Sequence, residues 1–192
     1  MSLLTFDPIA HRYALSGRTV RSVTQILRLS GVMRPSPFWT EEARERGQKV
    51  HTITAEFDTN SPQSSFDRYP ELGGYLDSWR IFLSETRAAV LDVEKRVYNP
   101  GLDYAGTFDR LLRIGGSEWI ADIKTSEVCE PWHCVQTMLY AMTFPAWPLR
   151  ACIHLSPDGY RLIPHTDPED YSIALAAVTL ASWHARHSKE EA

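Results

Sequence analysis

A pair of long strand-like segments, Tyr104–Ile114 and Trp119–Thr125, constrains the fold more than any other feature of the sequence. Gly115-Gly116-Ser117 separates them, and a glycine pair between two such segments is typical of a tight β-hairpin. A third strand-like segment, Val90–Tyr98, precedes the hairpin. Three consecutive strands of this length require helices or another sheet to cover their apolar faces. The chain is therefore expected to build a central sheet.

Helix and strand signals alternate after the hairpin. A helix is expected from Pro131 to about Phe144, then strands at Arg150–Leu155 and Tyr160–Ile163, then a final helix from about Pro168 to His187. This order predicts an α/β (α+β) fold with a mixed central sheet flanked by helices. Because 192 residues suit one domain, we expect a single unit. Its parts are residues 1–87 (N-terminal strands and helices), 88–165 (core sheet and motif helix) and 166–192 (C-terminal helix).

The first part of the chain combines strand and helix signals. Leu4–Leu15 resembles short strands, and Ser22 with Gln25 three residues later is typical of a capped helix start. A second helix is expected from Phe38 to about Phe57, interrupted at Gly47. A buried helix face is indicated by apolar residues at helical spacing, namely Leu72, Tyr75, Leu76, Trp79, Phe82 and Leu83.

Composition excludes several classes of protein. The longest apolar runs are shorter than the roughly 18 residues of a membrane span, and the N-terminus lacks the pattern of a signal peptide. Three cysteines are too few for a disulfide framework and suit a reduced, cytoplasmic compartment. The net charge of −4 argues against a purely electrostatic nucleic-acid binder. Residues 1–50 nevertheless carry +4 and the remainder −8, which indicates either a surface facing a polyanion or ordinary scatter.

The candidate chemistry lies on the hairpin. Asp122 and Lys124 are two residues apart, so they share one face of a strand, and Asp109 on the neighbouring strand comes alongside Asp122. Carboxylate oxygens are ligands that magnesium prefers, and a nearby lysine can orient or help to deprotonate a metal-bound water. The alternative is an ordinary Asp–Lys ion pair on the surface of a strand.

Two helices offer further polar side chains. Gln136 and Tyr140 are four residues apart, so they share a helix face and can bond the lysine or a phosphate. His51 can bind manganese or stand beside magnesium. Taken alone, His51 is more typical of a surface or capped histidine. The alternative for Gln136 and Tyr140 is a half-buried polar pair, with Tyr140 mainly in the core.

Together these motifs resemble the RecB-type branch of the PD-(D/E)XK nuclease superfamily. The resemblance rests on Gly47-x-x-x-His51, Gly106-x-x-Asp109, Asp122-x-Lys124-Thr125 and Gln136-x-x-x-Tyr140, in this order. It covers roughly residues 44–156 and is strongest to small phage-type and mitochondrial genome maintenance exonucleases. It implies a restriction-endonuclease-like αβββαβ core with an N-terminal helical extension.

The resemblance also implies a site. His51, Asp109, Asp122 and the carbonyl of Ile123 would bind one or two Mg²⁺ or Mn²⁺ ions, and Lys124 would be the catalytic lysine. Gln136 and Tyr140 would support the lysine and the DNA strand. Glu94 on the first core strand is either an outer ligand, a water-positioning group or a solvated charge.

DNA is the partner that the resemblance implies, as single strands or duplex ends, together with a possible recombinase, clamp or single-strand-binding protein. The residues expected to touch DNA are Ser22, Thr24, Arg44, Arg46 and Thr125. Phe38 and Trp39 could stack on bases. Helix capping explains Ser22 equally well, and core packing is the ordinary role of the two aromatic residues.

Other metal centres are not expected. An iron–sulfur cluster needs four cysteines, and the chain has three. Cys129, His133 and Cys134 lie close together, but the intervening Pro131-Trp132 and the lack of a second ligand pair argue against zinc.

The sequence thus predicts a metal-dependent deoxyribonuclease, specifically an exonuclease acting in DNA recombination, repair or processing. Two alternatives remain open. One is a structure-specific endonuclease with the same site, and the other is a non-catalytic DNA-binding module that assists recombination.

Overall fold

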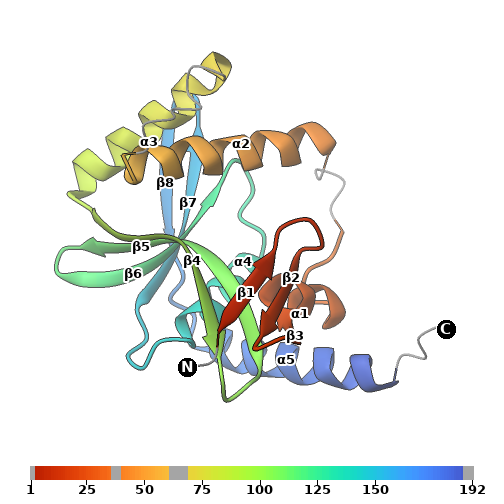
Figure 1. Ribbon diagram of the computed structural model, residues 1–192. Helices are drawn as coiled ribbons and strands as arrows, with labels where there is room; N and C mark the ends of the chain where they lie inside the picture. Colours follow the sequence, from red (N-terminus) through yellow and green to blue (C-terminus); the bar gives the residue numbers. More distant parts are fainter. Residues whose placement is uncertain (1–2, 36–39, 61–68, 188–192) are drawn as a thin grey trace.

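One mixed sheet of eight strands forms the centre of the molecule (Figure 1). The computed structural model describes residues 3–35, 40–60 and 69–187. The strands are β1 (Leu4–Asp7), β2 (Arg12–Leu15), β3 (Arg18–Ser22), β4 (Ala89–Asn99), β5 (Tyr104–Ile114), β6 (Ser117–Lys124), β7 (Leu149–Ser156) and β8 (Gly159–Pro164). The helices are α1 (Val23–Leu29), α2 (Glu41–Asp58), α3 (Gly73–Thr86), α4 (Trp132–Ala141) and α5 (Glu169–His187).

Strand β5 is the hub of the sheet. One edge pairs antiparallel with β4 along its whole length. The other edge divides its length between two partners. Its first two residues pair in parallel with the end of β3, and Arg110–Ile114 pair antiparallel with β6. Beyond β6, strand β7 is parallel and β8 antiparallel, and α4 makes the crossover between β6 and β7.

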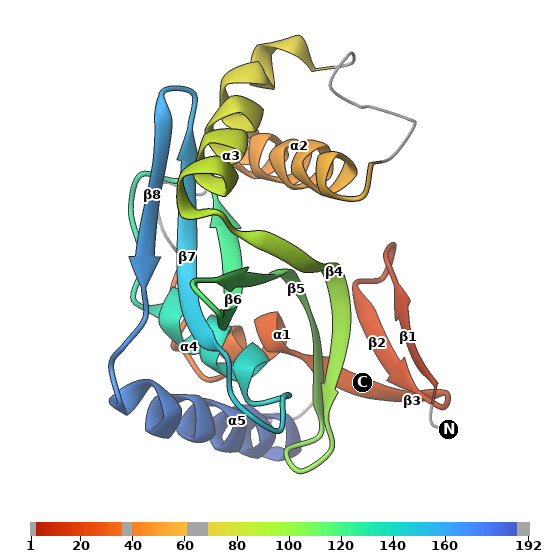
Figure 2. The same cartoon turned by 90° about the vertical axis from the view of Figure 1, so that its left-hand side faces the viewer.

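Helices cover both faces of this sheet (Figure 2). Helices α2 and α3 pack on one face through a core that includes Trp79, Phe82 and Ile123. Helices α1, α4 and α5 pack on the other face, where Ile120 and Leu139 are completely buried. The mixed central sheet flanked by helices is therefore confirmed, and the elements from α3 to β7 follow the order αβββαβ.

The alternation of side chains along β6 positions the candidate site. Ile123 points into the core beneath α2 and α3, whereas Ile120 points into the core beneath α1, α4 and α5. Since successive side chains alternate, Asp122 and Lys124 share the face of Ile120 and α4. Both polar residues thus face the helix that carries Gln136.

Several local predictions are confirmed. Ser22 caps α1 in a reciprocal capping box, in which its Oγ accepts from the Gln25 N–H at 3.1 Å and its own N–H donates to Gln25 Oε1 at 2.9 Å. The expected buried face of α3 is present, with Trp79 and Phe82 completely buried.

Other boundaries differ from expectation. Helix α4 ends at Ala141 rather than Phe144, because a residue before a proline, here Pro145, disfavours helical geometry. Helix α2 continues through Gly47 without interruption. The short strands expected over Leu4–Leu15 are present as β1 and β2, whereas β3 was not expected and completes a three-stranded antiparallel meander. Phe38 and Trp39 lie outside the described residues.

In the parts of the chain that the structure describes, every helix is too short or too polar to cross a membrane.

Candidate active site

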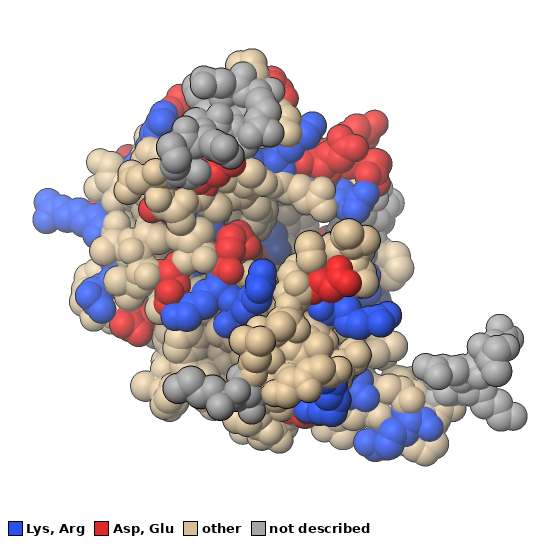
Figure 3. Space-filling model, in the orientation of Figure 1, with Lys and Arg blue, Asp and Glu red and all other residues tan. Residues whose placement is uncertain are grey.

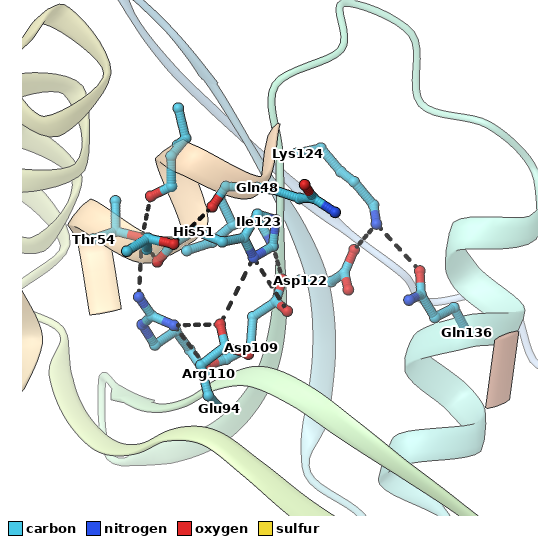
Figure 4. Close-up of polar contacts among 12 residues, drawn as sticks. Gln48, His51, Thr54, Glu94, Asp109, Arg110, Asp122, Ile123, Lys124 and Gln136 are labelled. Carbon is cyan, nitrogen blue, oxygen red and sulfur yellow. Dashed lines mark hydrogen bonds and ion pairs between the residues drawn. The ribbon is translucent and has the colours of Figure 1, made fainter. Parts of the chain in front are cut away.

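The candidate residues meet where β6 leaves the sheet, between α2 and α4 (Figure 4). They come from five elements that are far apart in the sequence. His51 lies on α2, Glu94 on β4, Asp109 on β5, Asp122 and Lys124 on β6, and Gln136 and Tyr140 on α4.

Three of these side chains form a group with the spacing of metal ligands. One ligand atom each from His51, Glu94 and Asp109 lies within 4.8 Å of the others. The Nδ1 atom of His51 is 3.5 Å from Asp109 Oδ1 and 3.7 Å from Glu94 Oε1. The sequence did not decide whether Glu94 is an outer ligand, a water-positioning group or a solvated charge. In the structure, Glu94 faces the same point as His51 and Asp109.

Asp109 joins this group to β6. Its Oδ2 accepts a hydrogen bond of 2.7 Å from the backbone N–H of Ile123. The hairpin pairs Arg110 with Ala121, so the next pair along the ladder sets Asp109 opposite Asp122, as the sequence predicts. Asp122 is almost completely buried and forms an ion pair with Lys124.

A polar chain runs from Lys124 into α4. The Lys124 ammonium donates to Gln136 Oε1 at 3.3 Å, and Gln136 Nε2 donates to the Tyr140 hydroxyl at 3.4 Å. Gly106 makes room for the tyrosine, because a Cβ at that position would lie 2.6 Å from Tyr140 Cε1. The Gly106 and Tyr140 positions of the motifs are therefore in direct contact.

The charges at this site depend on one another. Burial alone would lower the pKa of His51, but the carboxylates of Asp109 and Glu94 raise it to about 10. Burial alone would raise the pKa of Asp109, but His51 and Lys124 lower it to about 2. Without a metal, His51 is therefore an imidazolium that neutralises Asp109.

Asp122 behaves differently from Asp109. Burial and repulsion by Asp109 outweigh the attraction of Lys124 and raise the pKa of Asp122 to about 6. Burial would lower the pKa of Lys124, yet Asp122 and Asp109 raise it, so the lysine holds its proton at neutral pH. Two carboxylates with separated pKa values beside a charged lysine are typical of a functional site.

Arg110 is a residue that the sequence reasoning missed. Its guanidinium is completely buried and bonds Asp58 Oδ2 at 2.6 Å and Thr54 Oγ1 at 3.0 Å. It also lies 3.4 Å from Glu94 Oε1, so it links α2 to the carboxylate group. An arginine within an apolar strand, directly after Asp109, was the available signal.

Glu94 is held in an unusual backbone conformation. Its φ of 47° lies in the left-handed region, which costs a non-glycine residue about 1–2 kcal/mol. Its neighbours Val93 and Lys95 pair regularly with Arg110 and Phe108, and the register of β4 shifts separately between Val90 and Asp92. Strain of this kind clusters at functional sites, and here it accompanies contacts to His51 and Arg110.

A groove of about 870 Å³ leads to these residues along α2. His51 and Glu94 form one part of its lining, and Arg44, Gly47 and Thr59 form others. Figure 3 shows a hollow at the centre of this face, with basic and acidic side chains both present around it. A chain-like ligand could thus approach the carboxylates along the helix.

The residues expected to touch DNA are in different environments. Arg44 is exposed and pairs with Glu41, whereas the Nε atom of Arg46 is buried without a hydrogen-bond partner among the described residues. Thr125 faces α2, with its Oγ1 3.6 Å from the position of a Cβ on Gly47. Ser22 uses its hydroxyl as the cap of α1. Thr24, in the first turn of α1, is half-buried.

Comparison with known proteins gives likenesses to solved structures, but no match to a protein family. No protein-family model matches the sequence, and no curated protein matches it. A solved structure described as the crystal structure of SSO0001 is 18% identical, with a TM-score of 0.44. The match covers 88% of this chain and 76% of that one.

Proposed function

We propose that this chain is a metal-dependent deoxyribonuclease of the RecB-type branch of the PD-(D/E)XK superfamily, and that it degrades DNA from ends. The observation that carries the proposal is the convergence of Asp109, Asp122 and Lys124 at the end of β6, beside His51 and Glu94. The order of elements from α3 to β7 supports it.

The donor atoms suit magnesium or manganese. His51, Glu94 and Asp109 would hold the ion, with Asp122 and the Ile123 carbonyl as further donors. Once His51 is neutral, the carboxylates of Glu94, Asp109 and Asp122 carry more negative charge than Lys124 and Arg110 balance. This excess favours a divalent cation. When bound, such an ion lowers the pKa of a water molecule and stabilises charge on a phosphate oxygen.

The side chains of the protein supply the remaining chemistry. Lys124 keeps its proton, so it would orient the attacking water and stabilise negative charge on the phosphate. Gln136 holds the ammonium in place, and Tyr140 holds Gln136. The groove along α2 would receive the strand, with Arg44 in its lining near the phosphates and Thr125 beside Gly47.

A cleavage assay tests this proposal. Purified protein is incubated with end-labelled single- and double-stranded linear DNA and with a closed circle, in Mg²⁺, Mn²⁺ or EDTA. We expect metal-dependent loss of linear DNA that spares the circle, because only an endonuclease can open a closed circle.

Variants connect the activity to the site. Lys124→Ala and Asp122→Asn should reduce cleavage by at least about 10²-fold. Lys95→Ala is the matched control, since Lys95 is an exposed lysine on β4 that pairs with Asp92. Cleavage that survives in Lys124→Ala, or that persists in EDTA, would refute the proposal.

A further inference from the structure

A second group of metal-ligand side chains gathers around the connection from β6 to α4. Cys129 lies in that connection, His133 in the first turn of α4 and His154 on β7. The Cys129 sulfur and one nitrogen of each histidine lie within 4.8 Å of one another. His133 and His154 are only 2% and 3% exposed, so the group is built into the interior.

The histidines present unused nitrogen atoms. Nδ1 of His133 and Nε2 of His154 are buried, and neither has a hydrogen-bond partner among the described residues. The other nitrogen of His154, Nδ1, lies 2.7 Å from the carbonyl oxygen of Ser126. A carbonyl only accepts, so Nδ1 carries the proton and Nε2 presents a lone pair. A buried acceptor without a partner costs about 1–3 kcal/mol, which a bound metal would remove.

His165, which follows β8, has the same arrangement. The Thr137 hydroxyl donates to the carbonyl of Cys134 at 3.0 Å, so its oxygen accepts from His165 Nδ1 at 2.8 Å. This leaves a lone pair on His165 Nε2, which is also buried and without a partner among the described residues. His165 lies outside the group whose ligand atoms are within 4.8 Å of one another, so its ring would have to move toward the other three ligands to bind the same ion.

The donor atoms also suit zinc. Cysteine sulfur and histidine nitrogen are zinc ligands, whereas magnesium and calcium require oxygen.

We propose that Cys129, His133 and His154 bind a structural zinc ion, with His165 as the fourth ligand. A set of four protein ligands closes the coordination sphere, which is the arrangement of structural rather than catalytic zinc. This site is separate from the group of His51, Glu94 and Asp109. The spacing of residues along the sequence did not predict this site, because two of its ligands come from β7 and from the segment after β8.

The position of this site means that a zinc ion there would stabilise the connection from β6 to α4. The ion would fasten the connection that starts at Thr125 to α4, to β7 and to the segment after β8. Lys124 lies directly before this connection, and Gln136 lies three residues after His133. Cys152, which contacts Cys129, also lies 3.9 Å from Asp122 Oδ2. The zinc would therefore fix the Lys124–Gln136 contact, and only this consequence for catalysis rests on the proposed function.

Metal analysis of purified protein tests the site. We expect about one zinc per chain after dialysis against zinc and then against metal-free buffer, measured by mass spectrometry of the elements. Cys129→Ser and His154→Ala should each lose most of it. Cys134→Ser is the matched control, since that sulfur contacts the Pro131 carbonyl at 2.7 Å instead. Zinc-free wild-type protein, or equal loss in Cys134→Ser, would overturn the proposal.

Cobalt provides a readout that does not depend on the folding of variants. Wild-type protein stripped of metal and titrated with Co²⁺ should develop a thiolate-to-cobalt charge-transfer band and the visible bands of tetrahedral cobalt. Absence of these bands from folded wild-type protein would refute the site. Zinc content is read without DNA, so a protein that holds zinc but does not cleave refutes the nuclease alone. A protein that cleaves DNA but binds neither zinc nor cobalt refutes the zinc site alone.

Discussion

Replacing Gly106 with alanine tests the contact between β5 and α4 that supports the candidate site. The added Cβ would lie 2.6 Å from Tyr140 Cε1 and 2.9 Å from Val23 Cγ2, whereas ordinary contact begins near 3.4 Å. Tyr140 is 5% exposed and Val23 is 1% exposed, so neither can turn into solvent. Overpacking of this kind costs about 1–3 kcal/mol. For a chain of this size, a loss of about 2 kcal/mol lowers Tm by roughly 4–8 °C.

Urea unfolding followed by circular dichroism measures this loss. Gly47→Ala is the control, because Gly47 lies inside α2 and its added Cβ meets only Thr125 Oγ1, at 3.6 Å. We expect Gly47→Ala to gain about 0.5–1 kcal/mol from helix propensity. In a Tyr140→Ala background, Gly106→Ala should cost less, since only the contact with Val23 remains. Equal stability of Gly106→Ala and wild type would refute the packing argument.

Two further predictions concern buried charge. Asp109→Asn should lower the pKa of His51 from about 10 toward 6.5, measured by NMR titration of the imidazole. In the metal-free wild type, the His51 imidazolium adds folding stability that is complete below pH 6.5 and is lost as the pH rises through 10. Asp109→Asn should lose much of this stability. An unchanged His51 pKa in the variant would contradict the coupling between His51 and Asp109. Arg110→Leu should lower the free energy of unfolding by about 3–5 kcal/mol, because it leaves Asp58 buried without its cation. Arg113→Ala, which removes an exposed pair with Glu118, should change it by less than about 1 kcal/mol, and similar losses in both would contradict the role of Arg110.

Local patterns in the sequence predicted much of the architecture. The glycine pair at 115–116 and the strands around it specified the β5–β6 hairpin, and period-two alternation put Asp122 and Lys124 on one face. The four-residue spacing of Gln136 and Tyr140 predicted that they share a helix face, from which Gln136 bonds Lys124. Each of these features depends on neighbours in the sequence or on one hairpin, so the residues themselves contain the necessary information.

Features that depend on distant parts of the chain were not predictable in this way. The role of Arg110 requires Asp58 and Thr54 from α2, and the backbone of Glu94 is distorted where β4 meets that network. His154 lies near Cys129 only because β7 returns beside β6, and β8 on the far side of β7 leads to His165. Tertiary packing determines such contacts, and the spacing of residues along the chain does not predict them.

The two proposed metal sites have different ligands, and this difference determines which ion each site would bind. Zinc binds most sets of nitrogen, oxygen and sulfur ligands more tightly than manganese does, so ligand softness must direct each ion to its place. The Cys129 sulfur with buried imidazoles would retain zinc, whereas the carboxylates of Glu94 and Asp109 suit a harder ion. Asp122 lies between the two groups, paired with Lys124 on one side and near Cys152 on the other. A filled zinc site would therefore hold the lysine in position while the oxygen-rich group exchanges magnesium or manganese with solvent.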